Sequence, residues 1–479
     1  MSLPQRRERT IDMIILLLLS LLLFSSRLIM LSKSSEPCGL DGYFYAMEAR
    51  SFMERGHLEN FSLAPFYYVS GLLGLLSGSP ILGVKIASAL CSALLPVALF
   101  LLLNRLFSNQ RAFALLASLV ASASPSLALM AVNYLNNLLG LVFFLFFCLC
   151  ILSFLDTPAI LSGAGTILCA AGAVLSHPVT AVYLFVLFLL FLCSRLSRRL
   201  QIFLLSIAGV VAILALLFKG DYLRFRAGFS LLPGLPLLSP FFRKHLPVSV
   251  CLEMSLLFLL VYLFAFLYVI KKRTFSLLLL GIPVLYFPFW RLDSLDLGYR
   301  LFLSATPCGI ALTCFFAAEL FPKALGRQSW LRPFLAGVGV FLTFATITVY
   351  KPKQDPPYGL YRKVVASVDL SDDSLVIAHQ GLNHVYTFYK DFRDALNYEP
   401  DFPVPEGRLW RLAYEAPESV IKRRYPAAVE TGEIRSLGYG YLLIREKLWQ
   451  DYLAWEDEPI SRNLKNWYNP HSSRPRFVR

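Results

Sequence analysis

The first 350 residues contain few acidic side chains. They hold 13 Asp and Glu against 26 Lys and Arg, whereas residues 351–479 hold 18 acids and 19 bases. Over the whole chain 16% of the residues are charged and 57% are hydrophobic, while a soluble domain has roughly 25% charged residues. This scarcity of charge excludes an ordinary soluble protein. The basic excess lies in the apolar part, so it points to membrane topology and lipid phosphate rather than to nucleic acid.

The motifs of common soluble enzymes are also missing. The nine cysteines show no C-x-x-C spacing, and none lies beyond Cys314, which excludes a disulfide framework and a zinc site of that type. The chain has no phosphate-binding P-loop, no H-E-x-x-H, no G-x-S-x-G and no dinucleotide-binding glycine fingerprint. The chemistries that these motifs support therefore have no basis in this sequence.

Long apolar runs are what the sequence has instead. Residues 11–31 follow Arg6, Arg7 and Arg9 and are long enough to cross a membrane. They lack a small-residue cleavage site, so we expect an uncleaved anchor. Further spans are expected near residues 80–104, 112–131, 134–155, 159–176, 178–194, 200–218, 249–270, 274–290, 299–320 and 331–350. The sequence predicts a polytopic α-helical membrane protein with about eleven transmembrane helices.

The distribution of charge between the spans predicts an orientation. With the N-terminus inside, most bases fall in cytoplasmic turns and most acids in outside loops. This pattern holds only if residues 64–77, which are short and glycine-rich, lie in the outer interface instead of crossing. The last span then places residues 351–479 outside. We expect a multi-pass protein of the cell membrane, or of the ER membrane in a eukaryote.

The chain therefore divides into two predicted domains, a transmembrane domain at 1–350 and a small extracytoplasmic α/β domain at 351–479. Residues 374–378 and 440–444 have strand character and are bounded by polar residues or glycine. The roughly 120 residues of the tail are enough to bury a core of their own.

Polar groups on the predicted outer face are the candidates for chemistry. Asp41 precedes an amphipathic segment, 42–54, and would lie at or near the N-cap of that helix; it is either a simple cap or a catalytic carboxylate. Lys85 lies in apolar sequence near a span end, where it either snorkels to the interface or binds an anion.

Two basic loops add cations on the same side. The loop at 219–248 could contact lipid headgroups or bind an anionic ligand, and the loop at 291–300 could pair its own acids and bases or leave an arginine for phosphate. The cations concerned are Arg224, Arg226, Arg243, His245, Arg291 and Arg300. A carboxylate and a set of cations above a helical bundle suit transfer from an anionic lipid donor to a hydroxyl or amine.

The segment Asp-Gly-Tyr-Phe-Tyr-Ala-Met-Glu-Ala at 41–49, just after the first span, resembles the GT-C superfamily of membrane glycosyltransferases. The resemblance extends to the interfacial Ala-Pro-Phe-Tyr at 64–67 and to Val-Lys-Ile-Ala-Ser-Ala-Leu at 84–90. It is greatest to the protein O-mannosyltransferase and lipid A aminoarabinose transferase branch, glycosyltransferase family 39, and covers residues 10–350.

The resemblance implies a sugar transfer from a polyprenyl or dolichyl monophosphate carrier to an extracytoplasmic protein, lipid or glycan acceptor. It implies Asp41 as general base and Lys85, with arginines of the two loops, as donor-phosphate ligands; Tyr45 and Glu48 are further substrate-binding candidates. Many relatives have a second acid where this chain has asparagines, at 133, 136 and 137. We therefore expect transfer without a metal ion, and no other cofactor. Since Asp41 fits the role of a base better than that of a nucleophile, we expect one displacement, which inverts the anomeric carbon. The basic charge belongs to the apolar part, so no nucleic-acid partner is expected.

Two other classes of function stay open. A lipid or solute transporter would place its functional charges inside the spans, which are nearly free of charge apart from Glu253 and Glu319 near their ends. A non-catalytic assembly scaffold would use the tail to bind partners, and its function would not depend on Asp41.

Overall fold

In a computed structural model the chain forms two compact units. The structure describes residues 3–39, 41–59, 62–106, 111–177, 247–272, 295–320, 337, 357–371, 374–378, 380–390, 407–414 and 418–453. The described residues of Met1–Lys33, Leu63–Phe66 and Ile86–Lys351 belong to the first unit. Those of Ser34–Ser62, Tyr67–Lys85 and Pro352–Arg479 belong to the second. The predicted domains at 1–350 and 351–479 stay a prediction.

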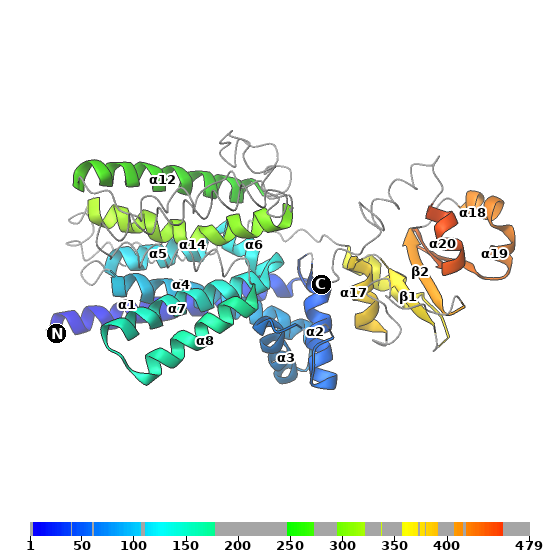
Figure 1. Ribbon diagram of the computed structural model, residues 1–479, viewed down its shortest axis with the longest axis horizontal. Coiled ribbons are helices and arrows are strands. Elements are labelled where there is room, and N and C mark those ends of the chain that lie inside the picture. Colours follow the sequence, from blue (N-terminus) through cyan, green and yellow to red (C-terminus); the bar gives the residue numbers. More distant parts are fainter. Residues whose placement is uncertain are drawn as a thin grey trace, which may run out of the picture. The chain divides into compact units, whose positions relative to one another are not determined.

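The first unit is a bundle of helices that run side by side (Figure 1). Among the described residues it contains α1 (Leu3–Ser32), most of α4 (Pro80–Leu106), α5 (Arg111–Ala123), α6 (Pro125–Asn133), α7 (Leu135–Asp156), α8 (Ile160–Ser176), α12 (Val248–Lys272) and α14 (Leu295–Leu320). In this described part, α1, α4, α7 and α12 are long and apolar enough to cross a membrane. The chain is thus a multi-pass membrane protein, as predicted.

The predicted span at 112–131 is divided into two helices. α5 and α6 meet at an angle of 52°, because Ser124 and Pro125 form a helix start: the Ser124 hydroxyl accepts a hydrogen bond from the Leu127 N–H at 3.1 Å. Glu253 of α12 also receives the Ser126 N–H at 2.8 Å and the Ser126 hydroxyl at 2.5 Å. A neighbouring helix thus satisfies the polar groups that the break leaves without an intrahelical partner. The predicted spans at 178–194, 200–218, 274–290 and 331–350 lie outside the described residues.

The second unit contains a mixed four-stranded sheet in the order β1-β2-β4-β3. β1 (Leu375–Ala378) runs parallel to β2 (Leu409–Tyr414), while β4 (Tyr441–Arg445) is antiparallel to β2 and to β3 (Ile434–Gly438). The strands predicted at 374–378 and 440–444 are confirmed as β1 and β4. The helices around the sheet are α16 (Tyr358–Ala366), α17 (Gln380–Tyr389), α18 (Glu418–Arg424), α19 (Pro426–Glu430) and α20 (Glu446–Leu453).

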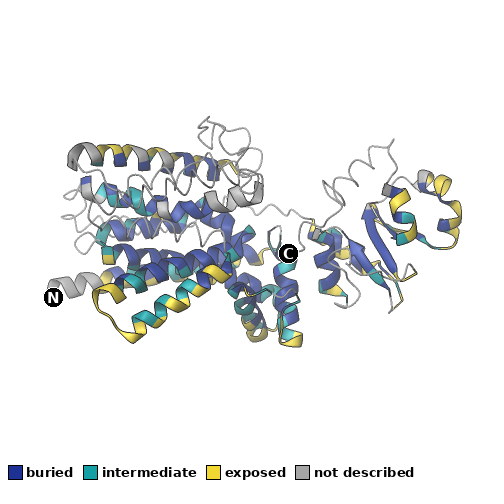
Figure 2. Ribbon diagram, in the orientation of Figure 1, coloured by how far each residue is buried: buried dark blue, intermediate teal, exposed yellow. Residues whose placement is uncertain are grey.

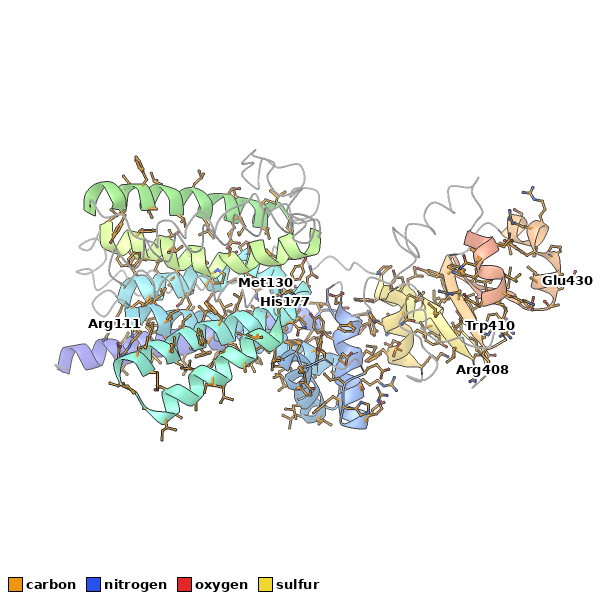
Figure 3. All side chains as sticks on the ribbon, in the orientation of Figure 1. Arg111, Met130, His177, Arg408, Trp410 and Glu430 are labelled. Carbon is orange, nitrogen blue, oxygen red and sulfur yellow. The ribbon has the colours of Figure 1, made fainter. Side chains whose placement is uncertain are left out.

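Both faces of this sheet are covered. Leu412 and Leu443 point to a core shared with α16 and α17, whereas their neighbours Ala413 and Leu442 point to a second core with Trp449 of α20. Alternate residues of a strand face opposite sides, so one short hydrophobic run contributes to two cores. Figure 2 shows that β1 and β2 are largely buried. Trp410 of β2 is 1% exposed and lies in the first of these cores (Figure 3).

Two helices from the N-terminal part of the chain pack in this second unit. The helix predicted at 42–54 is confirmed as α2 (Gly42–Arg55), and the segment predicted to lie in the interface forms α3 (Pro65–Ser77). The start of α4 approaches α3 closely, since a Cβ added at Gly83 would lie 2.4 Å from the Ser70 carbonyl oxygen. Tyr43 of α2 belongs to the same core as α16 and α17.

Candidate active site

Asp41 occupies the N-cap position of α2, as the sequence predicts. Its side chain makes no capping hydrogen bond, and its backbone lies at φ −103° and ψ 19°, in the sparsely populated bridge region. The helix begins there because Gly42 fits against Pro37, whose backbone carbon would be 3.1 Å from an added Cβ. The Asp41 carboxylate is therefore placed at a helix start without serving as its side-chain cap.

A tyrosine from far along the chain fills the capping role. The Tyr358 hydroxyl, at the first residue of α16, accepts the Gly42 N–H at 3.1 Å and donates to the Gly39 carbonyl at 2.8 Å. Burial is the first cause that raises the pKa of Tyr358, and the negative charge of Asp41 is the second. The hydroxyl therefore stays protonated and able to donate while it bonds both sides of Asp41.

Glu36 gathers a second polar cluster on the same loop. Its carboxylate accepts a hydrogen bond from the Tyr43 hydroxyl and lies 3.0 Å from the Arg362 guanidinium. The Tyr43 hydroxyl is also 2.9 Å from that of Tyr389. Burial, then the contacts with Glu36 and Tyr389, raise the pKa of Tyr43. Residues of α16 and α17 thus fix the orientation of the loop that carries Asp41.

Lys85 is tied to this loop from the α4 side. It is 6% exposed, and its ammonium donates to the Ser34 carbonyl at 2.6 Å. It is close enough to Cys38 and Glu36 to interact with both electrostatically, although burial raises the pKa of the Cys38 thiol more than Lys85 lowers it. A buried ammonium with a carboxylate nearby is not a snorkelling lysine, because its charge is held inside the protein.

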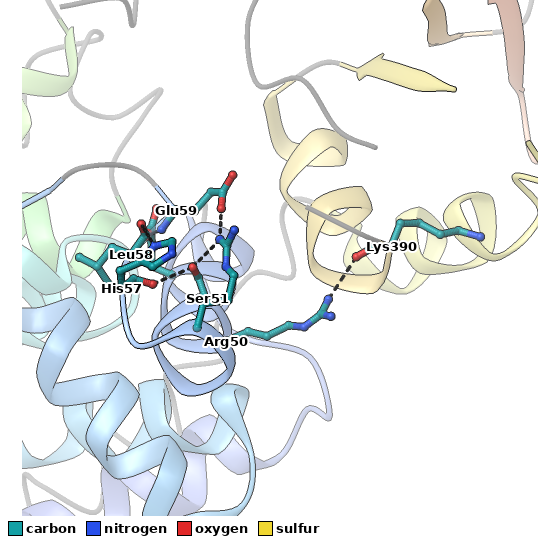
Figure 4. A network of polar contacts seen from close by, with 8 residues as sticks. Arg50, Ser51, His57, Leu58, Glu59 and Lys390 are labelled. Carbon is teal, nitrogen blue, oxygen red and sulfur yellow. Dashed lines mark hydrogen bonds and ion pairs between the residues drawn. The ribbon is translucent and has the colours of Figure 1, made fainter. Parts of the chain in front are cut away.

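Arg50 joins α2 to α17 (Figure 4). Its guanidinium donates to the carbonyl oxygens of Phe388 and Lys390, the latter at 3.3 Å, and pairs with Glu54 at 2.7 Å. Arg55, the last residue of the same helix, instead bonds Ser51 of α2 and Glu59 in the segment that follows the helix. Of these two arginines of one helix, the first bonds α17 and the second closes a local turn.

The other candidates of the first loop are buried. Glu48 is fully buried, and its carboxylate accepts the Glu59 N–H at 2.9 Å, so it closes the turn after α2. Tyr45 is 3% exposed, with its ring 5.6 Å from that of Tyr67. A role for either residue in substrate binding stays a prediction.

Most of the predicted cationic ligands cannot be placed. Arg224, Arg226, Arg243, His245 and Arg291 lie outside the described residues, and of Arg300 only its position on α14 is described. The asparagine group is described: Asn133 ends α6, and Asn136 and Asn137 are in the first turn of α7. Within the described ranges, no group of three or more His, Cys, Asp or Glu side chains could hold a metal ion.

Sequence reasoning missed the residues of the C-terminal segment that contact the loop. Tyr358, Arg362 and Tyr389 carry no motif, and only the fold brings them to Gly39, Glu36 and Tyr43. Glu36 appears in the sequence merely as one of several acids of the first outside loop. Its position among Tyr43, Lys85 and Arg362 distinguishes it from those other acids.

Known proteins share sequence features and the fold of this chain. A family model described as dolichyl-phosphate-mannose-protein mannosyltransferase matches residues 64–218. No curated protein matches the chain. ArnT from Cupriavidus metallidurans in the apo state is 14% identical with a TM-score of 0.53, over 91% of this chain and 98% of that one. The same protein bound to undecaprenyl phosphate is 14% identical with a TM-score of 0.51, over 90% of this chain and 97% of that one.

A third structure is similar over a smaller share of its length. The oligosaccharyltransferase AglB from Archaeoglobus fulgidus, solved with an inhibitory peptide and a dolichol-phosphate, is 11% identical with a TM-score of 0.54. The match covers 81% of this chain but only 64% of that chain. Together the family match and the shared fold confirm the resemblance to GT-C membrane glycosyltransferases of the family-39 type.

Proposed function

We propose that the chain, which shares its fold with GT-C membrane glycosyltransferases, moves a single sugar from a polyprenyl monophosphate carrier to an acceptor outside the cytoplasm. The similar proteins support the class of donor: ArnT has been solved with undecaprenyl phosphate and AglB with a dolichol-phosphate. The acceptor is a hydroxyl or amine of a protein, lipid or surface glycan.

The observation that carries this proposal is the arrangement of Asp41 and Lys85. Asp41 lies in the loop that follows the first apolar helix, at the start of α2, without a side-chain capping bond. Lys85 is buried and bonded to Ser34 of that same loop. A carboxylate on this loop and a buried cation of α4 that bonds the same loop match the needs of a lipid-phosphate donor and a nucleophilic acceptor.

In the proposed reaction Asp41 orients the acceptor and takes its proton as the acceptor attacks the anomeric carbon. Lys85 holds the phosphate of the carrier and stabilises its charge as the bond to the sugar breaks. One displacement inverts the anomeric centre. Because asparagines stand where many relatives have a second acid, we assign the reaction no metal ion. The C-terminal α/β segment lies outside the cytoplasm in this proposal.

The test uses the purified full-length protein in liposomes with radiolabelled dolichyl-phosphate mannose and undecaprenyl-phosphate sugars. Serine- and threonine-containing peptides and an envelope lipid extract serve as acceptors. We expect the wild type to convert one donor to product of inverted configuration, and Asp41→Asn to lower turnover by about 10²–10⁴-fold, the usual value of general-base assistance. Equal turnover by Asp41→Asn, or no transfer from any donor of the panel, would contradict the proposal.

A further inference from the structure

The Tyr358 hydroxyl bonds the backbone on both sides of Asp41. It donates to the Gly39 carbonyl at 2.8 Å and accepts the Gly42 N–H at 3.1 Å. Gly42 N–H also lies 3.3 Å from the Gly39 carbonyl oxygen. The three groups close a small hydrogen-bonded ring around the turn at 39–42, with Asp41 inside the turn.

The backbone conformation alone does not fix this turn. Gly39 has φ 88°, a value that glycine adopts at little cost, and Asp41 lies in the bridge region, which is common in turns. Contacts with the surroundings must therefore define its orientation. Tyr358, and Pro37 packed against Gly42, supply such contacts.

Tyr358 is itself held firmly. It is 6% exposed, and its ring packs edge-on against Tyr43 at 4.8 Å and Tyr361 at 6.4 Å. These rings belong to the core that α16 and α17 form with the sheet. The position of the hydroxyl is therefore set by the packing of the C-terminal segment and passed to the turn through two hydrogen bonds.

We propose that Tyr358 is a positioning residue for Asp41, so that the C-terminal segment takes a direct part in the turnover of the enzyme. The proposal rests on the proposed function of Asp41. The Tyr358 hydroxyl acts through the backbone of Gly39 and Gly42 and so sets the direction of the Asp41 carboxylate relative to the acceptor. Misplacement of a reacting group by about 1 Å can cost about 10²-fold in rate, so a loosened turn should lower kcat.

The variant that tests this is Tyr358→Phe, which keeps the ring and removes only the hydroxyl. A matched control is Tyr425→Phe in the other core of the same segment, where the hydroxyl donates to Asp451 at 2.7 Å. Each variant removes the hydroxyl of a buried tyrosine together with two hydrogen bonds, but only Tyr358 lies beside Asp41. A difference in hydrogen exchange or turnover between the two variants therefore reflects the loss of support for the turn at Asp41 rather than a general loss of stability.

The first measurement is hydrogen exchange of the peptide that spans residues 39–45 in the full-length protein, without any substrate. Loss of a hydrogen bond of ordinary strength should speed exchange of the Gly42 amide about tenfold in Tyr358→Phe. Tyr425→Phe should leave this peptide unchanged. Unchanged exchange in Tyr358→Phe would overturn the proposed support of the turn, whatever the enzyme does.

The second measurement is a double-mutant cycle on turnover, with the donor and acceptor that the liposome assay identifies. We expect Tyr358→Phe to lower kcat about 10–100-fold with the KM for the lipid donor within about twofold. The double variant with Asp41→Asn should be no slower than Asp41→Asn alone, because Tyr358 acts through Asp41.

The outcomes separate this inference from the proposed function. If the two rate losses multiply, or if Tyr358→Phe keeps full turnover, Tyr358 does not position Asp41, while Asp41 can still be the base. If Asp41→Asn alone keeps full turnover, the proposed role of Asp41 fails and the positioning role fails with it.

Discussion

The carboxylate of Glu36 lies 3.0 Å from the guanidinium of Arg362, and its other oxygen accepts the hydroxyl of Tyr43. One acid of the first loop thus bonds a helix of the C-terminal segment and the first turn of α2. Lys85 is near enough to act on Glu36 electrostatically. The negative charge of Glu36 is thus close to the positive charges of Arg362 and Lys85. This attraction offsets part of the free-energy cost of burying Lys85 in the apolar helix α4.

Glu36→Gln should lower stability modestly, since the amide retains an acceptor for Tyr43 but loses the ion pair. Arg362 is 49% exposed, so solvent screens the pair and the expected cost is about 1 kcal/mol. This corresponds to a fall in melting temperature of roughly 2–4 °C. The control Glu54→Gln breaks a more exposed pair with Arg50 and should change less. A larger loss in the control would contradict a structural role for Glu36.

Arg50→Met should loosen α2 from α17, because the carbonyl oxygens of Phe388 and Lys390 lose a charged donor. Hydrogen bonds to charged groups contribute about 1.5–3 kcal/mol. We expect faster hydrogen exchange at residues 380–390 and a lower melting temperature. Arg55→Met, which breaks contacts inside the 51–59 loop, is the control and should leave exchange in α17 unchanged. If both variants affect α17 equally, Arg50 does not join the two helices.

Local patterns were enough to predict the elements that carry the candidate site. Asp41 before an amphipathic run predicted the start of α2, and short apolar runs between breaks predicted β1 and β4. These signals are periodicity and capping, which neighbouring residues determine. The sequence also contains a signal for the break between α5 and α6, since Ser124 followed by Pro125 is typical of a helix start. The continuous apolar run at 112–131 led to the prediction of one span instead.

Long-range pairing was not predictable in the same way. The Tyr358 hydroxyl reaches Gly39, and Arg362 reaches Glu36, through the packing of α16 on the sheet and on Tyr43. The sequence around Tyr358 and Arg362 does not indicate these partners. Helical periodicity predicts which face of a helix is buried, but not which distant residues that face contacts. Fixed cations at 224–245 and 291 fall outside the described residues, so their role stays a prediction.

Asp41→Ala tests whether Asp41 is a helix cap. Loss of a capping side chain typically costs about 1 kcal/mol, but Asp41 makes no side-chain capping bond. We expect the melting temperature to stay within about 2 °C of the wild type, although turnover falls. The control is Ser124→Ala, which removes the side-chain cap of α6 and should lower stability. A stability loss at Asp41 as large as that at Ser124 would restore the capping interpretation.

Lys85→Met should weaken binding of the lipid donor before it affects the chemical step. Methionine keeps much of the apolar stem and removes the charge that we assign to the donor phosphate. A charge-assisted hydrogen bond lost from such a site lowers affinity by about 10–100-fold. The affinity is measured as the rise in melting temperature of the full-length protein when undecaprenyl phosphate is added. The control is Lys33→Met, at an exposed lysine just after α1. If the two variants bind undecaprenyl phosphate with equal affinity, Lys85 is not a ligand of the donor phosphate.

His384 gives the folded protein a dependence on pH. It is 8% exposed on α17, with its ring 5.0 Å from that of Phe44, and burial lowers its pKa to about 4. An unfolded chain protonates histidine near pH 6.5. Between about pH 6.5 and 4 the unfolded chain therefore binds a proton that the folded protein does not, so stability falls as the pH drops through this window and levels off below it.

The difference between a pKa near 6.5 in the unfolded chain and about 4 in the folded protein corresponds to about 3 kcal/mol of stability once the pH is below both values. His384→Phe removes the proton-binding group and keeps a ring beside Phe44. We expect the melting temperature of the variant to fall less than that of the wild type between pH 7 and pH 4.5. The exposed His57, changed to Phe, should leave the wild-type dependence intact. A pH dependence in His384→Phe as steep as in the wild type would mean that other groups, and not this buried imidazole, destabilise the segment in acid.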